Sequence, residues 1–360
     1  MNDNSQLQLS IRANKIAEAI PVYYMAKRVP LFLGPPGIAK TAFVRVGANT
    51  IGPDVVVREL HLASMSEVDV RGYLIPQGDL AKFTAPEFWA TVMQHPRGIL
   101  FLDEFVQASH EVQKAVAPLI LEGRIGEYVL PTGWSVALAG NNLDDGAGAN
   151  TLLSHIVNRV QIINVTPPDV DEWAMWAINA GLPFELIAFA KALPHLVFNG
   201  AVPEEPNAPY CTPRSVHSLG DTANAFPGGL RSMVDSDLGM AMIQGAIGMG
   251  PAVELVQLVR NTINLPSFDD VVRNPGSTRV PTSPSEAYAM VMLCSVRAQV
   301  DTIESVMQYL ERFQTNFSIT GVISLIRRDK RLAQNKRMLA WVMANRDVLM
   351  KFNKYITEAL

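Results

Sequence analysis

A run of small residues that ends in lysine and threonine has the pattern of a phosphate-binding loop. The segment comprises Gly34, Pro35, Pro36, Gly37, Ile38, Ala39, Lys40 and Thr41. Such a loop aims backbone N–H groups and a helix N-terminus at phosphate oxygens, while its lysine adds positive charge and its hydroxyl binds magnesium. Because proline has no N–H group, we expect the donors to come from Gly37 through Thr41. The segment therefore predicts a site for a nucleotide and Mg²⁺.

Ala39 departs from the strict pattern G-x-x-x-x-G-K-[ST], in which glycine stands at this position. An alanine is tolerated if its φ is negative, and it costs about 1–2 kcal/mol if the loop requires a left-handed residue. That cost does not forbid nucleotide binding. The alternative is a surface Gly-Pro turn followed by a helix that begins with lysine and threonine. The apolar run before the loop and the helix expected after it favour the nucleotide site.

Two adjacent acids, Asp103 and Glu104, end the apolar run "GILFLDEF". A buried strand rarely ends in paired carboxylates without a cationic partner, and a divalent metal beside a nucleotide is such a partner. Asp103 would hold magnesium, mostly through water, and Glu104 would orient and polarise the attacking water. In the alternative interpretation, Asp103 is a helix N-cap and Glu104 interacts with the helix dipole. The upstream Lys40 and Thr41 favour the catalytic interpretation.

Asn141 and Asn142 follow the next apolar run, "WSVALAG", and Arg159 directly precedes the last one. An amide at this place can hydrogen-bond both the attacking water and the γ-phosphate. Asparagine after glycine is also common in turns, so the amide alone is a weak signal. Arg159 is either a cation near a helix C-terminus or an arginine finger that reaches a nucleotide.

Five short apolar runs separated by helix-length segments predict the elements that position these residues. They span residues 29–34, 55–62, 98–103, 134–140 and 160–165. Nearly continuous apolar strands that alternate with helices indicate an α/β fold, with a parallel sheet covered on both faces. After residue 169 the pattern becomes helical. We expect an α/β core followed by a second half that is all helix.

The composition argues against several classes of protein. The chain has 360 residues, 48% of them hydrophobic, and its net charge of −4 gives no general attraction for nucleic acid or anionic membranes. Two cysteines, no apolar run of about 20 residues and no signal peptide predict a reducing, cytoplasmic location. The six histidines show no pairs at metal-ligand spacing, which argues against a structural zinc site.

Together, these motifs resemble those of MoxR-type AAA+ ATPases, in the subgroup whose genes accompany von Willebrand factor A domain proteins. "GPPGIAKT" resembles the Walker A loop of that family, and "GILFLDEF" resembles its Walker B strand. The resemblance implies an AAA+ core with a five-stranded parallel sheet over 1–167, a helical lid over 168–295 and a C-terminal helical extension over 296–360. It assigns site roles to Lys40, Thr41, Asp103, Glu104, Asn141 or Asn142 (sensor 1), Arg159 (arginine finger) and Arg214 (sensor 2, in "CTPRSV").

Two insertions also resemble that family, one at about 67–90 in the second helix of the core and a hairpin at 122–136. In such ATPases these insertions face the central opening of a ring and touch substrate. Alternatively, they are peripheral hairpins that cover a sheet edge.

The resemblance implies a hexameric ring that hydrolyses ATP to remodel or activate a protein client, with a von Willebrand factor A domain protein as the candidate. The alternatives are a DNA-directed motor and a nucleotide-gated scaffold with little hydrolysis. The basic segment 327–337 is expected to be a solvated helix face, with a docking surface as the minority alternative.

Overall fold

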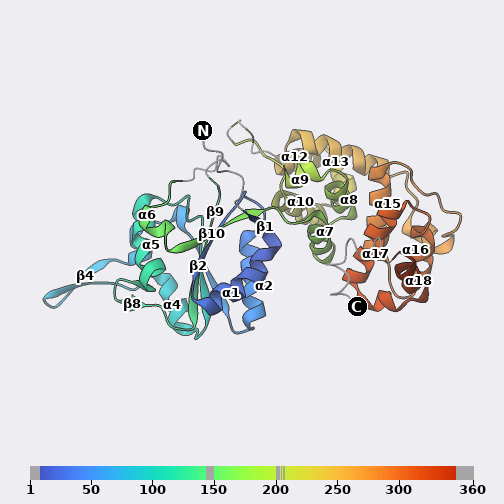
Figure 1. Ribbon diagram of the computed structural model, residues 1–360. Helices are drawn as coiled ribbons and strands as arrows, with labels where there is room; N and C mark the ends of the chain where they lie inside the picture. Colours follow the sequence, from blue (N-terminus) through green and yellow to red (C-terminus); the bar gives the residue numbers. More distant parts are fainter. Residues whose placement is uncertain (1–8, 143–149, 200–202, 204, 206, 346–360) are drawn as a thin grey trace, which may run out of the picture. The chain divides into compact units, whose positions relative to one another are not determined.

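A computed structural model of the chain describes residues 9–142, 150–199, 203, 205 and 207–345 (Figure 1). Contacts between residues divide the chain into two units, Met1–Pro168 and Asp169–Leu360. Each unit has its own hydrophobic core. Among the described helices, none combines the length and the apolar composition that a membrane span requires.

The first unit is built around a parallel sheet of six strands with the order β1–β10–β2–β9–β6–β3. The strands are β1 (Ser10–Arg12), β2 (Val29–Leu33), β3 (Val56–His61), β6 (Gly98–Asp103), β9 (Trp134–Gly140) and β10 (Val160–Thr166). All five predicted apolar runs form strands, and the predicted α/β fold is confirmed. The sheet has one strand more than expected, because the short β1 pairs with β10 at one edge. Three residues are too few to show an apolar pattern in the sequence.

Helices cover both faces of this sheet. They are α1 (Ile16–Ala26), α2 (Lys40–Ile51), α3 (Glu67–Arg71), α4 (Glu87–Gln94), α5 (His110–Glu122) and α6 (Ser154–Val157), with 3-10 turns at Ala13–Lys15 and Leu62–Ser64. Phe32 and Phe101 pack with α1 and α2, whereas their neighbours Leu31 and Leu100 pack with α4 and α5. Successive strand side chains point to opposite faces, so strands covered on both faces are apolar throughout.

The two predicted insertions contain separate hairpins. β4 (Leu74–Gln77) pairs antiparallel with β5 (Leu80–Phe83), and β7 (Arg124–Ile125) pairs antiparallel with β8 (Tyr128–Val129). The longer hairpin extends away from the sheet of its unit (Figure 1). The hydroxyl of Tyr128 donates to the backbone oxygen of Phe83 at 3.1 Å, so the two hairpins contact each other. The large apolar side chains that the longer hairpin exposes are Tyr73, Leu74, Ile75 and Leu80.

The described part of the second unit is helical. Its helices are α7 (Val170–Asn179), α8 (Phe184–Ala192), α9 (Pro194–Phe198), α10 (Pro213–Ala225), α11 (Gly229–Val234), α12 (Asp237–Ile247), α13 (Met249–Thr262), α14 (Phe268–Arg273), α15 (Pro284–Arg297), α16 (Ile303–Leu310), α17 (Thr315–Arg328), the 3-10 helix η4 (Lys330–Gln334) and α18 (Lys336–Ala344). One hydrophobic cluster runs from Trp173 to Met338. The predicted boundary between 295 and 296 falls inside α15, and the end of the predicted extension, 346–360, lies outside the described residues.

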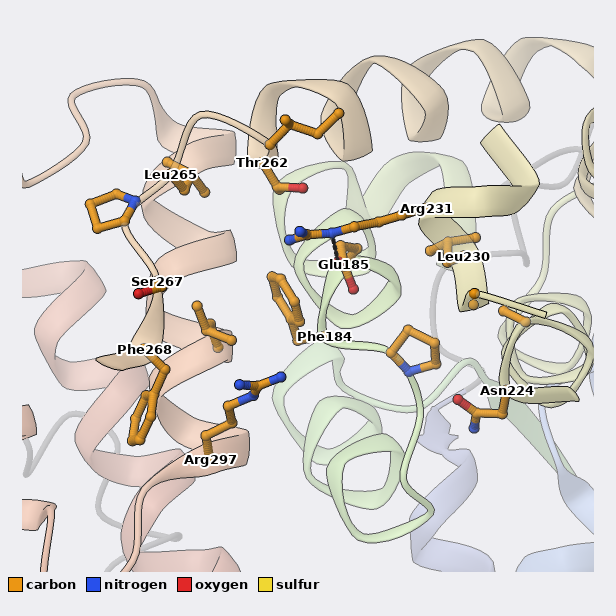
Figure 2. A pocket seen from close by; sticks show the side chains of 17 residues that line it. Phe184, Glu185, Asn224, Leu230, Arg231, Thr262, Leu265, Ser267, Phe268 and Arg297 are labelled. Carbon is orange, nitrogen blue, oxygen red and sulfur yellow. Dashed lines mark hydrogen bonds and ion pairs between the residues drawn. The ribbon is translucent and has the colours of Figure 1, made fainter. Parts of the chain in front are cut away.

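A cavity of about 660 Å³ in the second unit has a buried carboxylate in its lining (Figure 2). Glu185, at the start of α8, accepts a hydrogen bond from Nε of Arg231 in α11 at 3.2 Å. Burial raises the pKa of the Glu185 carboxyl, while the charges of Arg231 and Arg297 act in the opposite direction. The ion pair offsets part of the desolvation cost and joins α8 to α11.

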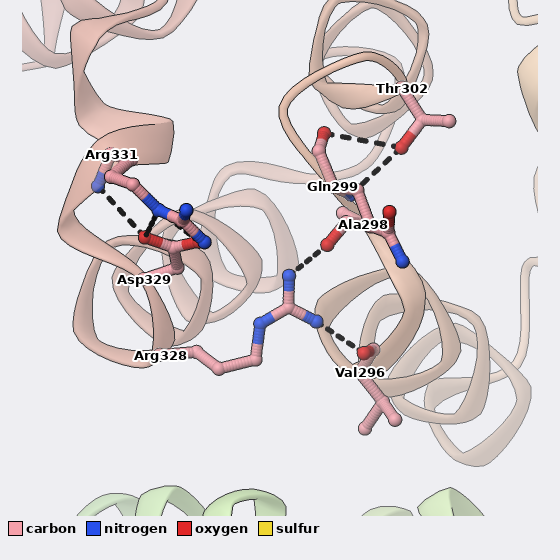
Figure 3. A network of polar contacts seen from close by, with 7 residues as sticks. All are labelled: Val296, Ala298, Gln299, Thr302, Arg328, Asp329 and Arg331. Carbon is pink, nitrogen blue, oxygen red and sulfur yellow. Dashed lines mark hydrogen bonds and ion pairs between the residues drawn. The ribbon is translucent and has the colours of Figure 1, made fainter.

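The basic segment 327–337 makes contacts within the second unit. Arg328 donates to two backbone oxygens at the end of α15, where carbonyl groups lack helical partners (Figure 3). Arg331 forms an ion pair with Asp329 at 2.7 Å. Arg337 pairs with acidic residues of α16 and of its C-terminal end. The segment therefore contributes to helix contacts in addition to facing solvent.

We expect Gly72→Ala to destabilise the first unit more than Gly78→Ala. Both glycines have positive φ, 84° and 64°, which side chains rarely adopt, so each alanine carries a strain of about 1–3 kcal/mol. A Cβ at Gly72 would also lie 1.9 Å from the backbone oxygen of Thr84, whereas one at Gly78 would meet nothing within 4 Å. Thermal unfolding of the two variants measures the difference. Equal melting temperatures would contradict the close packing at Gly72.

Candidate nucleotide-binding site

The predicted phosphate-binding loop connects β2 to α2, which begins at Lys40. Ala39 directly precedes the helix with φ 66° and ψ 31°, which is the left-handed conformation. The alanine therefore carries a strain of about 1–2 kcal/mol that glycine would avoid. Gly34 has a separate constraint, since a Cβ there would lie 2.3 Å from the backbone oxygen of Val165 in β10. The loop adopts this conformation even though the backbone of Ala39 is strained.

Lys40 and Asn141 meet although they are 101 residues apart in the sequence. Lys40 is buried, and its Nζ donates to the backbone oxygens of Gly34 and Pro35 at 2.7 and 3.0 Å. The same Nζ donates to Oδ1 of Asn141 at 3.1 Å. A phosphate oxygen would offer this ammonium group a stronger, charge-assisted partner. The ammonium group of Lys40 and the side-chain amide of Asn141, both predicted site groups, are therefore in direct contact.

Thr41 and Asp103 supply two oxygen groups that fit a magnesium ion. Oγ1 of Thr41 donates to Oδ2 of Asp103 at 2.8 Å, which joins the start of α2 to the end of β6. Oδ1 of Asp103 accepts from the backbone N–H of Glu104 at 2.8 Å, so the carboxylate is held in one orientation. Magnesium is typically bound by one or two carboxylates together with waters and substrate phosphates, and this pair of oxygens suits that pattern.

Glu104 has an uncommon backbone conformation at the end of β6. Its φ is 56°, and a left-handed residue other than glycine costs about 1–2 kcal/mol. Strain of this kind is concentrated at functional sites. The next helix, α5, begins only at His110 and has Ser109 as its N-cap. The alternative in which Asp103 caps a helix and Glu104 lies in its first turn is therefore wrong.

Gln107 also belongs to the site and was missed by the sequence analysis. Its Oε1 accepts from the backbone N–H of Asn141 at 3.3 Å, and its Nε2 donates to the backbone oxygen of Asn141 at 3.4 Å. These two bonds hold Asn141 beside Lys40. No local pattern could have revealed this role, because Gln107 and Asn141 meet only through the pairing of β6 with β9.

The remaining predicted residues are Asn142, Arg159 and Arg214. Asn142 follows Asn141, and residues 143–149 of the same loop lie outside the described residues. Arg159 is exposed directly before β10, and its side chain makes no hydrogen bond or ion pair with the described residues. Arg214 is exposed in the first turn of α10 in the second unit. Its side chain also makes no hydrogen bond or ion pair with the described residues.

Residues 30–159 match the family model described as the AAA domain of the dynein-related subfamily. The first unit carries an AAA domain. The matched range contains the phosphate-binding loop, the two acids at the end of β6, and the predicted residues Asn141 and Arg159. AAA domains as a class bind and hydrolyse nucleotides, and the proteins that carry them typically form oligomeric rings.

Two solved structures are similar to the chain at a low level. A RuvB variant from Thermotoga maritima is 15% identical, with a TM-score of 0.40, over 72% of this chain and 73% of that chain. NtrX from Brucella abortus, in complex with ADP, is 15% identical, with a TM-score of 0.34, over 94% of this chain and 68% of that chain. Similarity at this level says nothing about activity. No curated protein matches the chain.

We expect Ala39→Gly to stabilise the AAA domain by roughly 0.5–1 kcal/mol. The substitution removes the left-handed strain, and the greater freedom of glycine in the unfolded chain cancels only part of that gain. Ala42→Gly is a matched control, since Ala42 lies exposed within the first turn of α2 and glycine should cost about 1 kcal/mol in a helix. Urea unfolding measures both changes. Two changes of the same sign would contradict the left-handed conformation of Ala39.

Proposed function

We propose that this AAA domain hydrolyses ATP and that the chain acts as a MoxR-like ring ATPase that remodels or activates a partner protein. The observation that carries the proposal is the meeting of Lys40 with Asn141 and of Thr41 with Asp103. These contacts lie at the carboxyl ends of the neighbouring strands β2, β9 and β6, where open α/β sheets bind their ligands. Phosphoryl transfer needs a cation, a metal site and a group that orients water, and all three have candidates there.

Each residue of the cluster has one role in this proposal. Lys40 binds the phosphates together with the N–H groups of the loop, and Thr41 and Asp103 hold magnesium. When bound, magnesium neutralises charge that develops on the phosphate oxygens. Glu104 orients and polarises the attacking water, and its carboxylate has no hydrogen-bond partner among the described residues that would compete for this role. Asn141, held by Gln107, is assigned as sensor 1 in preference to Asn142.

Glu104→Gln and Glu104→Gly separate the chemical role of this residue from its backbone strain. Both variants should lose ATP turnover by a factor of about 10² or more, because neither has a general base. Only Glu104→Gly should gain stability, by roughly 0.5–1 kcal/mol, because only glycine relieves the left-handed strain. Steady-state hydrolysis and urea unfolding measure the two effects. Turnover that is unchanged in Glu104→Gln would disprove the assigned role, whereas a wild type that binds ATP and hardly hydrolyses it would favour a nucleotide-gated scaffold.

Ring formation is proposed as the source of a further cation for the cluster. Phosphoryl transfer is accelerated strongly by an arginine finger, which can come from a neighbouring subunit. Arg159 is exposed and its side chain has no partner among the described residues, so it is available to a second copy of the chain. A contact that joins different surfaces of two subunits closes into a ring when the rotation allows. A hexamer, and a sensor 2 role for Arg214, are taken from the family resemblance.

The ATPase rate per chain should rise with protein concentration in the wild type and stay low and flat in Arg159→Ala. The reason is that each active site would be completed only when a neighbouring subunit supplies Arg159. Nucleotide binding to the variant is the control, since binding needs only residues of one subunit. Equal rates for both proteins, independent of concentration, would show that Arg159 is a simple surface cation and that the active unit is a monomer.

The partner is proposed to be a protein. The β4–β5 hairpin exposes apolar side chains at Tyr73, Leu74, Ile75 and Leu80, a pattern that fits contact with protein rather than with the nucleic-acid backbone, which attracts basic residues. In the second hairpin, Arg124 pairs with Glu122 at 2.7 Å and so adds little positive charge. A von Willebrand factor A domain protein is the candidate from the resemblance. Salt-sensitive binding of DNA would favour a DNA-directed motor instead.

A further inference from the structure

Three side chains that can bind a metal converge at the edge of the sheet, next to the nucleotide site. Glu59 and His61 lie two residues apart in β3, so their side chains share one face of the strand. His61 pairs in register with Asp103 of the neighbouring strand β6. One ligand atom from each of these three residues lies within 4.8 Å of the others. The backbone of two paired strands holds this arrangement in place.

The surrounding contacts leave part of the cluster open to an ion. Thr41 and Arg45 lie one turn apart in α2, and each holds one carboxylate of the cluster. Thr41 donates to Oδ2 of Asp103 at 2.8 Å, and Arg45 donates to Oε2 of Glu59 at 2.6 Å. The other oxygen of Glu59, Oε1, lies 3.6 Å from Nε2 of His61. The side chain of His61 is 59% exposed, so ions in solution can reach it.

We propose that Glu59, His61 and Asp103 bind a divalent transition metal ion of the zinc type. The imidazole decides the class of ion, because magnesium and calcium prefer oxygen ligands whereas zinc accepts nitrogen and carboxylate oxygen together. Bond lengths of about 2.0–2.1 Å in a tetrahedral site place neighbouring ligand atoms roughly 3.3 Å apart, close to the separation of His61 and Glu59. Water completes the coordination. The spacing of histidines in the sequence could not reveal this site, because it contains a single histidine together with carboxylates from two strands.

This ion would regulate the site rather than take part in the reaction. Asp103 is also the carboxylate assigned to magnesium, so the two ions would compete for it. The inferred competition with magnesium rests on the proposed function. Binding of the transition metal would lower ATP hydrolysis by weakening the hold on magnesium and its nucleotide.

The test is a titration of the nucleotide-free, full-length protein with Co²⁺, followed by its visible absorption, and with Zn²⁺, followed by calorimetry. We expect one equivalent to bind to the wild type, and His61→Ala to bind at least about tenfold more weakly. His217→Ala is the matched control. Nε2 of His217 lies 3.6 Å from Oδ2 of Asp221, the same separation as in the cluster, but no third ligand joins that pair among the described residues. Its affinity should equal that of the wild type.

Two results would overturn the proposal: a wild type that binds neither ion, or His61→Ala binding as tightly as the wild type. The first result would leave the three residues as parts of a network of ion pairs and hydrogen bonds. Glu59→Gln is a second test variant, because it should also bind the metal more weakly than the wild type. Its melting temperature reports whether the loss of the Arg45 contact disturbs the fold. The metal titrations contain no ATP, so they succeed or fail independently of the proposed hydrolysis. The ratio of ATPase rates with and without zinc then tests the competition.

Discussion

The parallel pairing of β2, β9 and β6 is the constraint on which the candidate site depends. Parallel strands bring their carboxyl ends to the same edge of a sheet, and the residues that follow these strands are therefore neighbours. Gly140 allows the approach, because a Cβ there would lie 2.5 Å from Cγ2 of Val106. The backbone N–H of Gly34 donates to the oxygen of Gly140 at 3.3 Å, and that of Phe105 donates to the oxygen of Ala139 at 2.9 Å. The site is thus fixed by backbone contacts before any side chain is considered.

Backbone strain collects at the same edge. Ala39 and Glu104 are both left-handed, and each costs about 1–2 kcal/mol relative to glycine. Both conformations follow from the place of the residue. Ala39 must turn the chain into α2, and Glu104 must turn it out of β6 while its N–H remains bonded to Asp103. The two apolar cores on either face of the sheet supply the stability that tolerates this strain.

Charge around the site is balanced by a small number of contacts from α2. Its first residues place Lys40 at the loop, Thr41 against Asp103 and Arg45 against Glu59, so the acids at the ends of β6 and β3 each have a partner on the same helix. The carboxylates are only partly buried, and hydrogen bonds of this kind keep such groups in a defined orientation. An ion or a phosphate would therefore meet an arranged set of oxygens and donors rather than a flexible surface.

The sequence by itself determined the fold class, the five main strands and the positions of Lys40, Thr41, Asp103 and Glu104 at strand ends. Local patterns were enough because strands buried on both faces must be apolar throughout, and the polar residues of the site come soon after these apolar runs in the sequence. Only the tertiary structure decided that Ala39 is left-handed, that Gln107 holds Asn141, and that β1 joins the sheet. Only the tertiary structure, likewise, placed His61 beside Asp103. These features depend on which segments meet and in which register, and contacts between residues 34 to 154 positions apart leave no local pattern in the sequence.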